Sequence, residues 1–167
     1  MKEPINQMLE DYSIAEMLKM DLSTVLGKWK WTKAVANHLD EWHCRQYRDI
    51  YYGIISRTRE EIVHSKESGD VKYYLKWEKD IFNVRNQNAG SLQSLLKCVG
   101  NCDEMHEKAL PEKKQGVMNM RNLFTDYLKQ EWGLTDDQIT QGICNPYGYA
   151  QQWVTEDIAD KGYLRYI

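Results

Sequence analysis

The spacing of apolar residues constrains this chain more than any other feature of its sequence. From Leu22 to His64 apolar side chains recur at intervals of three and four residues, and no proline interrupts them. This spacing places apolar side chains along one face of an α-helix, so we expect one long helix that reaches His64. Gly27 and Gly53 each weaken that helix by about 1 kcal/mol relative to alanine but leave the pattern intact.

A second stretch with the same spacing begins near Val71 and continues to Met105, and the asparagine-rich patch at residues 83–90 is a point where it can break. A third, shorter helix is expected from Pro111 through Trp132, because proline is tolerated in the first turn of a helix. The two long stretches are separated by a short polar turn, so we expect them to pack in opposite directions.

Shorter helices flank these stretches. Apolar positions in residues 4–20 predict one or two short amphipathic helices, Thr135 with Gln138 forms the sequence signature of a capping box, and a last helix is expected over residues 149–160. We therefore predict an all-α fold of two long antiparallel helices with shorter N- and C-terminal helices. Helices of this shape often leave part of their apolar stripe uncovered within one chain, where other subunits can pack, so an oligomeric helical bundle is expected. A monomeric bundle that closes on itself is the alternative.

The length of 167 residues suits one domain with a small appendage. No run of 18 apolar residues is present to span a membrane, and the first residues lack the apolar stretch of a signal peptide. We therefore expect a cytoplasmic protein whose four cysteines are reduced thiols. Cys98 and Cys102 share a helix face, where two small core residues are a better explanation than a metal or redox pair.

The charges are distributed unevenly although the net charge is only −3. Residues 28–59 hold seven lysines and arginines against three acidic residues, whereas residues 126–167 hold seven acidic residues against three basic ones. A basic block and an acidic tail on one chain suggest that an anionic partner binds at the basic end. The tail is expected either to face a different partner or to compete for the basic block.

Candidate catalytic and metal-binding patterns are weak. Three histidines follow an acidic residue by three positions, as in the ligand pairs of carboxylate-bridged di-iron bundles. They are His43 after Asp40, His64 after Glu61 and His106 after Asp103. Solvated helix faces explain these pairs better than a metal-binding bundle does. The sequence has no nucleophile elbow, phosphate loop or zinc-protease helix, so we expect neither an enzyme nor a cofactor.

The basic block interleaves cations with aromatic residues, most clearly where residues 28–33 read Lys-Trp-Lys-Trp-Thr-Lys. Such a mixture binds single-stranded nucleic acid, because cations follow the phosphates while aromatic faces stack on bases. The residues predicted to contact nucleic acid are Lys28, Lys30, Lys33, Arg45, Arg48, Tyr51, Tyr52, Arg57 and Arg59. Composition alone equally supports the view that Trp29 and Tyr51 are core residues and that the cations are merely solvated.

Several short motifs occur in an order that resembles a known family. Residues 48–53 read Arg-Asp-Ile-Tyr-Tyr-Gly, and residues 71–84 carry lysine, leucine, Lys-Asp and apolar positions in the family's order. Residues 95–98, Leu-Leu-Lys-Cys, and residues 120–124, Met-Arg-Asn-Leu-Phe, follow. Together these motifs are similar to those of the UvsY family, the recombination mediator proteins of T-even-type phages.

The resemblance divides the chain into a mediator-like helical domain, residues 1–124, and an acidic, aromatic-rich extension, residues 125–167, which has no counterpart in the family. It implies a phage-encoded protein of the host cytoplasm that binds single-stranded DNA and forms a homo-oligomer. Such a protein helps to load a recombinase onto DNA that is coated by single-strand-binding protein. Arg48 matches the family's basic position before the tyrosine pair, and Arg45 replaces its basic neighbour. The family's Arg-Gly-aromatic turn is replaced by residues 109–116.

Two points stay open from the sequence. Tyr51 and Tyr52 either stack on bases or form a buried contact at an oligomer seam. The main alternative to a mediator is a helical phage structural or assembly protein that does not bind nucleic acid, because the same amphipathic helices serve either role.

Overall fold

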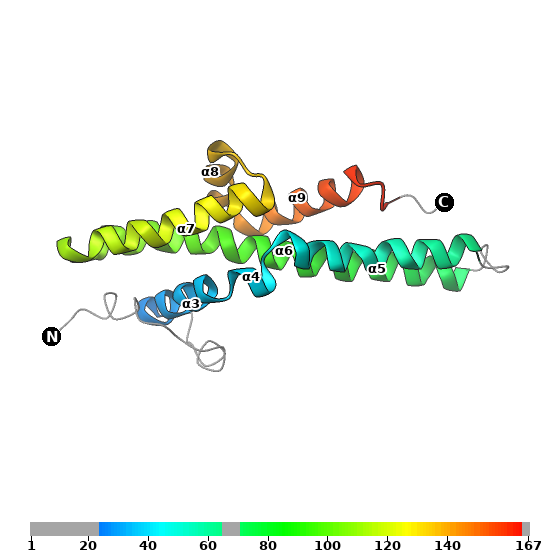
Figure 1. Ribbon diagram of the computed structural model, residues 1–167, viewed down its shortest axis with the longest axis horizontal. Helices are drawn as coiled ribbons and strands as arrows, with labels where there is room; N and C mark the ends of the chain where they lie inside the picture. Colours follow the sequence, from blue (N-terminus) through cyan, green and yellow to red (C-terminus); the bar gives the residue numbers. More distant parts are fainter. Residues whose placement is uncertain (1–23, 65–70, 165–167) are drawn as a thin grey trace.

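The computed structural model describes residues 24–64 and 71–164, in which every regular element is helical (Figure 1). The all-α prediction is confirmed. Within these two ranges no helix is long and apolar enough to cross a membrane. In chain order the elements are α3 (Val25–Asn37), α4 (Leu39–Trp42), α5 (Arg45–His64), α6 (Val71–Lys108), the 3-10 helix η1 (Pro111–Lys113), α7 (Lys114–Trp132), α8 (Asp136–Cys144) and α9 (Pro146–Asp160).

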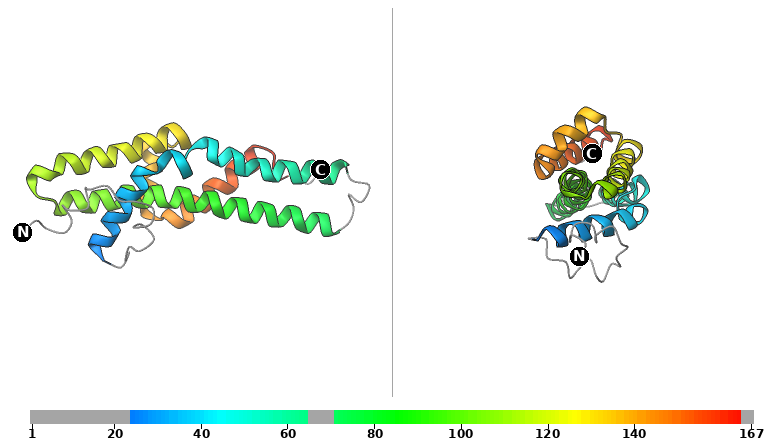
Figure 2. Two further views of the ribbon diagram at one scale, coloured as in Figure 1. Left: turned by 60° about the horizontal axis from the view of Figure 1, so that its bottom comes forward. Right: turned by 90° about the vertical axis from the view of Figure 1, so that its left-hand side faces the viewer.

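Helix α6 is the axis on which the other helices pack. Its 38 residues include no proline and continue through the asparagine-rich patch, where the buried Asn88 amide donates to the Val84 carbonyl at 2.9 Å. At 1.5 Å per residue, α6 is about 57 Å long. Helix α5 lies beside its N-terminal half and α7 beside its C-terminal half, while α9 packs on a further face (Figures 1 and 2).

The prediction of one unbroken first helix is wrong. The described part of that segment forms three helices, with breaks at His38 and after Trp42. A break leaves backbone carbonyls without intrahelical donors, and here side chains from other elements replace them. Ser91 Oγ on α6 donates to the Trp42 carbonyl at 3.3 Å, and Trp132 Nε1 on α7 donates to the His43 carbonyl at 2.9 Å. The breaks redirect the chain, so that α3 crosses α6 whereas α5 runs along it (Figure 2).

One apolar core joins the described helices. Its large buried side chains include Trp29 of α3, Leu92 of α6, Phe124 of α7 and Ile158 of α9. The domain boundary that we placed at residue 124 falls inside α7, and α9 shares the core. The described part of the C-terminal extension therefore packs within the same bundle as the helices before it.

The two cysteines of α6 lie inside this core. Cys98 and Cys102 are free thiols with no exposed surface. Burial raises the pKa of both thiols, that of Cys102 to about 12, so neither is ionised at neutral pH. Their environment is the one expected of small core residues.

Local sequence signals explain how the C-terminal helices begin and end. Gly133 ends α7 at φ 66°, in the left-handed region where glycine has no Cβ to clash. Thr135 and Gln138 form the predicted capping box at the start of α8, and Pro146 occupies the first turn of α9. These caps return the chain to α6.

Candidate nucleic-acid interface

The residues predicted to contact nucleic acid fall into two groups in the structure. Lys28, Lys30 and Lys33 lie on α3, and each is partly exposed. The others lie on α5: Arg45, Arg48, Tyr51, Tyr52, Arg57 and Arg59. Because the chain changes direction between α3 and α5, the two groups have different neighbours.

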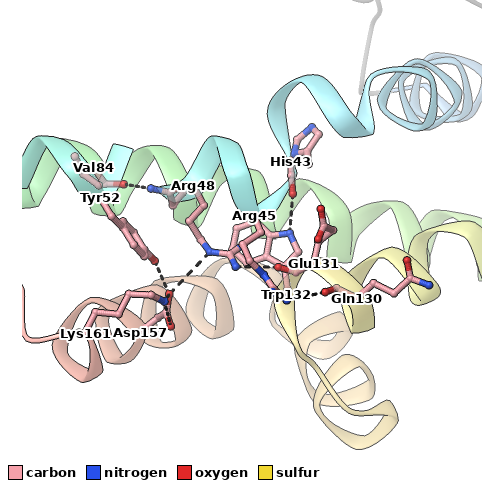
Figure 3. Close-up of polar contacts among 11 residues, drawn as sticks. His43, Arg45, Arg48, Tyr52, Val84, Gln130, Glu131, Trp132, Asp157 and Lys161 are labelled. Carbon is pink, nitrogen blue, oxygen red and sulfur yellow. Dashed lines mark hydrogen bonds and ion pairs between the residues drawn. The ribbon is translucent and has the colours of Figure 1, made fainter. Parts of the chain in front are cut away.

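Arg45 and Arg48 hold the C-terminal end of α7 (Figure 3). Arg45 Nη2 donates to the Gln130 carbonyl and Arg48 Nη2 to the Glu131 carbonyl, each at 2.8 Å. The two carbonyls before these accept from the backbone N–H groups that follow the helix. Four successive carbonyls are therefore satisfied, and two positive charges lie at the negative end of the helix dipole.

The guanidinium of Arg48 is buried between aromatic rings. Its Cζ lies 4.2 Å from the ring centroid of Trp132 and 5.5 Å from that of Trp153, and its Nε lies 3.9 Å from Asp157 Oδ2. Burial lowers the pKa of the guanidinium, although the negative charge of Asp157 opposes the shift. Only 5% of the side chain is exposed, so we remove Arg48 from the predicted interface.

We also remove Tyr52 from the predicted interface, because it is buried. Its ring is buried, and its hydroxyl donates to Asp157 Oδ2 at 2.8 Å. Burial, followed by the charge of Asp157, raises the pKa of Tyr52 above its ordinary value. The same carboxylate accepts from Lys161 Nζ at 2.8 Å, so it links α5 to the end of α9 (Figure 3).

The remaining α5 residues do not form a shared cationic surface. Arg59 Nη1 donates to the Gly162 carbonyl at 3.0 Å, and the hydroxyl of the partly buried Tyr51 lies 3.1 Å from that of Tyr47. Arg57 is exposed. Arg45, Arg48 and Arg59 thus contact backbone carbonyls in the C-terminal part of their own chain.

An open polar surface lies where α3 crosses α6. A hollow of about 480 Å³ is lined by Lys28, Trp31, Gly90, Gln93, Ser94, Lys97 and Asn101. An adjoining hollow of about 490 Å³ is lined by Trp42, His43, Tyr47, Asn86, Gln87, Gly90, Ser91 and Ser94. Gly90 and Ser94 belong to both hollows, which therefore meet, and we name the pair the α6 groove.

The charge of the α6 groove is positive. Among the described residues that line it, two are lysines and none is acidic. Lys97 is exposed and makes no ion pair with any other described residue. Lys28 Nζ lies 3.7 Å from Glu104 Oε2, but that carboxylate also binds Lys108 at 2.9 Å. A phosphate can therefore replace this long ion pair without leaving Glu104 unpaired.

Aromatic rings and amides supply the rest of the groove. Trp31 and Trp42 are partly exposed, and neither indole N–H has a hydrogen-bond partner in the described part of the chain. The side chains of Asn86 and Gln93 likewise make no hydrogen bond within it. The Asn101 amide, by contrast, is fixed by donating to Thr32 Oγ1 at 2.9 Å. An unpaired base placed here meets flat rings and unused polar groups.

His43 forms part of the groove wall and is neutral. Burial lowers its pKa to about 4, and a hydrogen bond with the Ser91 backbone opposes this shift. The Oγ of Ser91 lies 2.6 Å from His43 Nδ1. Among the described residues that line the groove, Lys28 and Lys97 therefore supply the positive charge at neutral pH.

Of the residues that line the groove, the sequence predicted Lys28 as a contact, and Trp31 lies in the Lys-Trp motif beside it. The residues that were not predicted as contacts are Trp31, Trp42, His43, Tyr47, Asn86, Gln87, Gly90, Ser91, Gln93, Ser94, Lys97 and Asn101. Their spacing carried a usable signal, since positions 86, 90, 94, 97 and 101 are three or four apart and hence share one helix face. The patch at residues 83–90 does not interrupt the helix, and its residues Asn86, Gln87 and Gly90 lie on an exposed part of the helix surface.

The acid–histidine pairs do not converge on a metal site. Each carboxylate binds another group: Asp40 accepts from the Tyr127 hydroxyl at 2.9 Å, Glu61 pairs with Lys76 at 3.1 Å, and Asp103 pairs with Arg121 at 2.5 Å. Over residues 24–64 and 71–164 no group of three or more potential metal ligands is found.

Over the described residues, fold and site together define a helical-bundle protein with a cationic, aromatic-lined groove along α6. No family model, curated protein or solved structure matches this chain.

Proposed function

We propose that this protein binds single-stranded DNA in the α6 groove and acts as an accessory protein of recombination. The observation that supports this best is the presence of two lysines, two accessible indoles and unused amides in one open groove. Lysines attract the phosphates, whereas aromatic faces stack only on bases that are unpaired. A groove of this kind favours single strands over duplex and needs no catalytic group.

The role of mediator rests on the resemblance to the UvsY family. A mediator holds the strand in a form that the recombinase prefers, which is an energetic coupling between two ligands. The proposed partners are therefore a phage recombinase and single-strand-binding protein. Because Arg48 and Tyr52 are buried here, we assign strand contact to Lys28, Trp31 and Lys97 instead.

Self-association is the second part of the proposal. On the face of α6 opposite the buried Val84, Leu75 and Phe82 are 56% and 55% exposed and lie one heptad apart. Glu78 and Lys79 lie on either side of this apolar stripe, and neither makes an ion pair with another described residue. A second copy packed in parallel about a two-fold axis places each Glu78 beside the partner's Lys79.

The same stripe favours a second candidate function, a helical structural or assembly protein without nucleic-acid binding. Leu75 and Phe82 have the heptad spacing of side chains that pack between helices of an assembly. The two functions differ in whether the α6 groove is occupied by DNA.

Fluorescence anisotropy with a labelled single strand, and with a duplex of equal length, tests DNA binding. We expect binding of the single strand at low salt, weaker binding of the duplex, and loss of affinity in Lys97→Ala and Trp31→Ala. Arg57→Ala removes an equally exposed cation from α5 and is the matched control. Absence of binding at about 50 mM salt refutes the DNA proposal and leaves the assembly protein.

Sedimentation analysis of charge-reversed variants tests the seam. Glu78→Lys and Lys79→Glu each place like charges together and should shift the protein toward monomer, whereas the double reversal should restore association. A wild-type protein that stays monomeric at all concentrations refutes self-association through this stripe.

A further inference from the structure

Gly90 occupies a position where the fold itself does not call for glycine. It lies in the middle of α6, and glycine is a poor helix former because it loses the most backbone freedom. Its φ is not positive, and a Cβ built on it meets no atom of the described chain within 4 Å. By comparison, a Cβ at Gly142 would lie 2.8 Å from both methyl groups of Leu96, so packing explains that glycine.

Free space around a glycine does not by itself indicate a binding site, because a Cβ at Gly53 in α5 would also have no neighbouring atom within 4 Å. Gly90 differs in its place, because it lies where the two hollows of the α6 groove meet. A side chain at position 90 would project into the groove. Ser94, one turn further along, donates its hydroxyl back to the Gly90 carbonyl at 2.9 Å. The floor shared by the two hollows is therefore low and lacks a projecting side chain.

Each of the two hollows that share this floor contains a tryptophan, and one of them also contains two lysines. Trp31 belongs to one hollow and Trp42 to the other, and Lys28 and Lys97 lie on the side of Trp31. The indole of Trp42 is held by the His38 ring, whose centroid lies 5.2 Å away at an interplanar angle of 30°. A flat, uncharged group placed over the floor has an indole in each adjoining hollow, and an anion attached to it has the two lysines in the hollow of Trp31.

We propose that the floor formed by Gly90 and Ser94 is the seat of one nucleobase of the bound single strand, with its phosphates directed toward Lys28 and Lys97. This assignment rests on the proposed DNA binding and names the point at which the strand is gripped. Along α6, the groove runs from Asn86 to Asn101, a rise of about 22 Å. A stacked strand advances about 3.4 Å per nucleotide, so the groove holds about six nucleotides.

The test compares Gly90→Leu and Gly90→Ala with Gly53→Leu, which places the same side chain at an open helix position outside the groove. Affinity for labelled single strands of increasing length is measured for each, and urea unfolding checks the fold. We expect all three variants to unfold at urea concentrations no lower than wild type. Gly90→Leu should bind at least tenfold more weakly, Gly90→Ala less so, and Gly53→Leu as wild type. Affinity of the wild type should stop rising near six nucleotides.

The outcomes separate this assignment from the proposed function. A wild-type protein that binds no DNA refutes both. Binding by wild type and by Gly90→Leu with equal affinity refutes the seat alone and leaves DNA binding intact. If Gly90→Leu does not fold, the assignment is tested by the quenching of tryptophan fluorescence when the oligonucleotide binds. This quenching should be smaller in Trp31→Phe and in Gly90→Ala than in the wild type. Unchanged quenching in both variants refutes the seat.

Discussion

Replacing Arg48 by alanine should destabilise the protein strongly, because this cation joins three helices. The change removes a charged hydrogen bond to the Glu131 carbonyl, which contributes about 1.5–3 kcal/mol, and a buried contact with the Trp132 ring, which contributes up to about 2 kcal/mol. It also leaves Asp157 with one cation fewer. The variant no longer has to bury a charged guanidinium, whose desolvation lowers the pKa of Arg48 in the wild type, and this offsets part of the loss. We therefore expect a net loss of about 3 kcal/mol.

Urea unfolding followed by circular dichroism measures this loss. With a denaturant slope of about 2 kcal/mol/M for a chain of this size, the midpoint should fall by about 1.5 M. Arg45→Ala is the matched control, because Arg45 makes the equivalent hydrogen bond to the preceding carbonyl, that of Gln130, from an exposed position. Its loss should cost no more than about 1 kcal/mol. Arg48→Lys should fall between the two, since lysine keeps the charge but cannot stack as a planar group.

A loss below about 1 kcal/mol in Arg48→Ala would contradict the structural role that we assign to Arg48. If stability is unchanged and affinity for single-stranded DNA falls, the residue belongs to the interface that the sequence predicted. The stability measurement thus decides between the two roles.

Further expectations concern the groove and the C-terminal helices. A plot of the logarithm of DNA affinity against the logarithm of salt concentration should have a slope of about −1.4 for two lysine–phosphate contacts. Lys28→Ala and Lys97→Ala should each make this slope shallower by about 0.7. A slope near zero in the wild type contradicts electrostatic binding. The folded-state pKa of His43, about 4, lies below the ordinary value of 6.5. The contribution of neutral His43 to stability is therefore complete above pH 6.5 and is lost as the pH falls toward 4. The free energy of unfolding should fall by about 2 kcal/mol between pH 7.5 and pH 5, and His43→Gln should abolish this decrease. Deleting residues 145–167 exposes the surface that Val154 and Ile158 cover and should unfold the bundle, and a truncated protein that keeps its cooperative unfolding would show that α9 is dispensable.

Elements that depend on neighbours in the chain could be predicted from the sequence. Helical spacing gave the fold class, and Pro111, Gly133 and the Thr135 capping box gave helix ends close to those observed. These signals work because a helix closes its hydrogen bonds within four residues and its caps use the side chains beside it. Lys28, Lys30 and Lys33 of α3 could be chosen as candidates because their alternation with tryptophan is visible within residues 28–33.

The tertiary structure decided where the first helix breaks and which cations remain accessible. The break beside His43 depends on donors from Ser91 and Trp132, which lie 49 and 89 residues from the carbonyls that they satisfy. Arg48 and Lys97 are both basic residues on amphipathic helices, yet one is buried against α7 and α9 and the other faces an open groove. Burial is set by what packs on a helix from distant parts of the chain, and no local pattern records it.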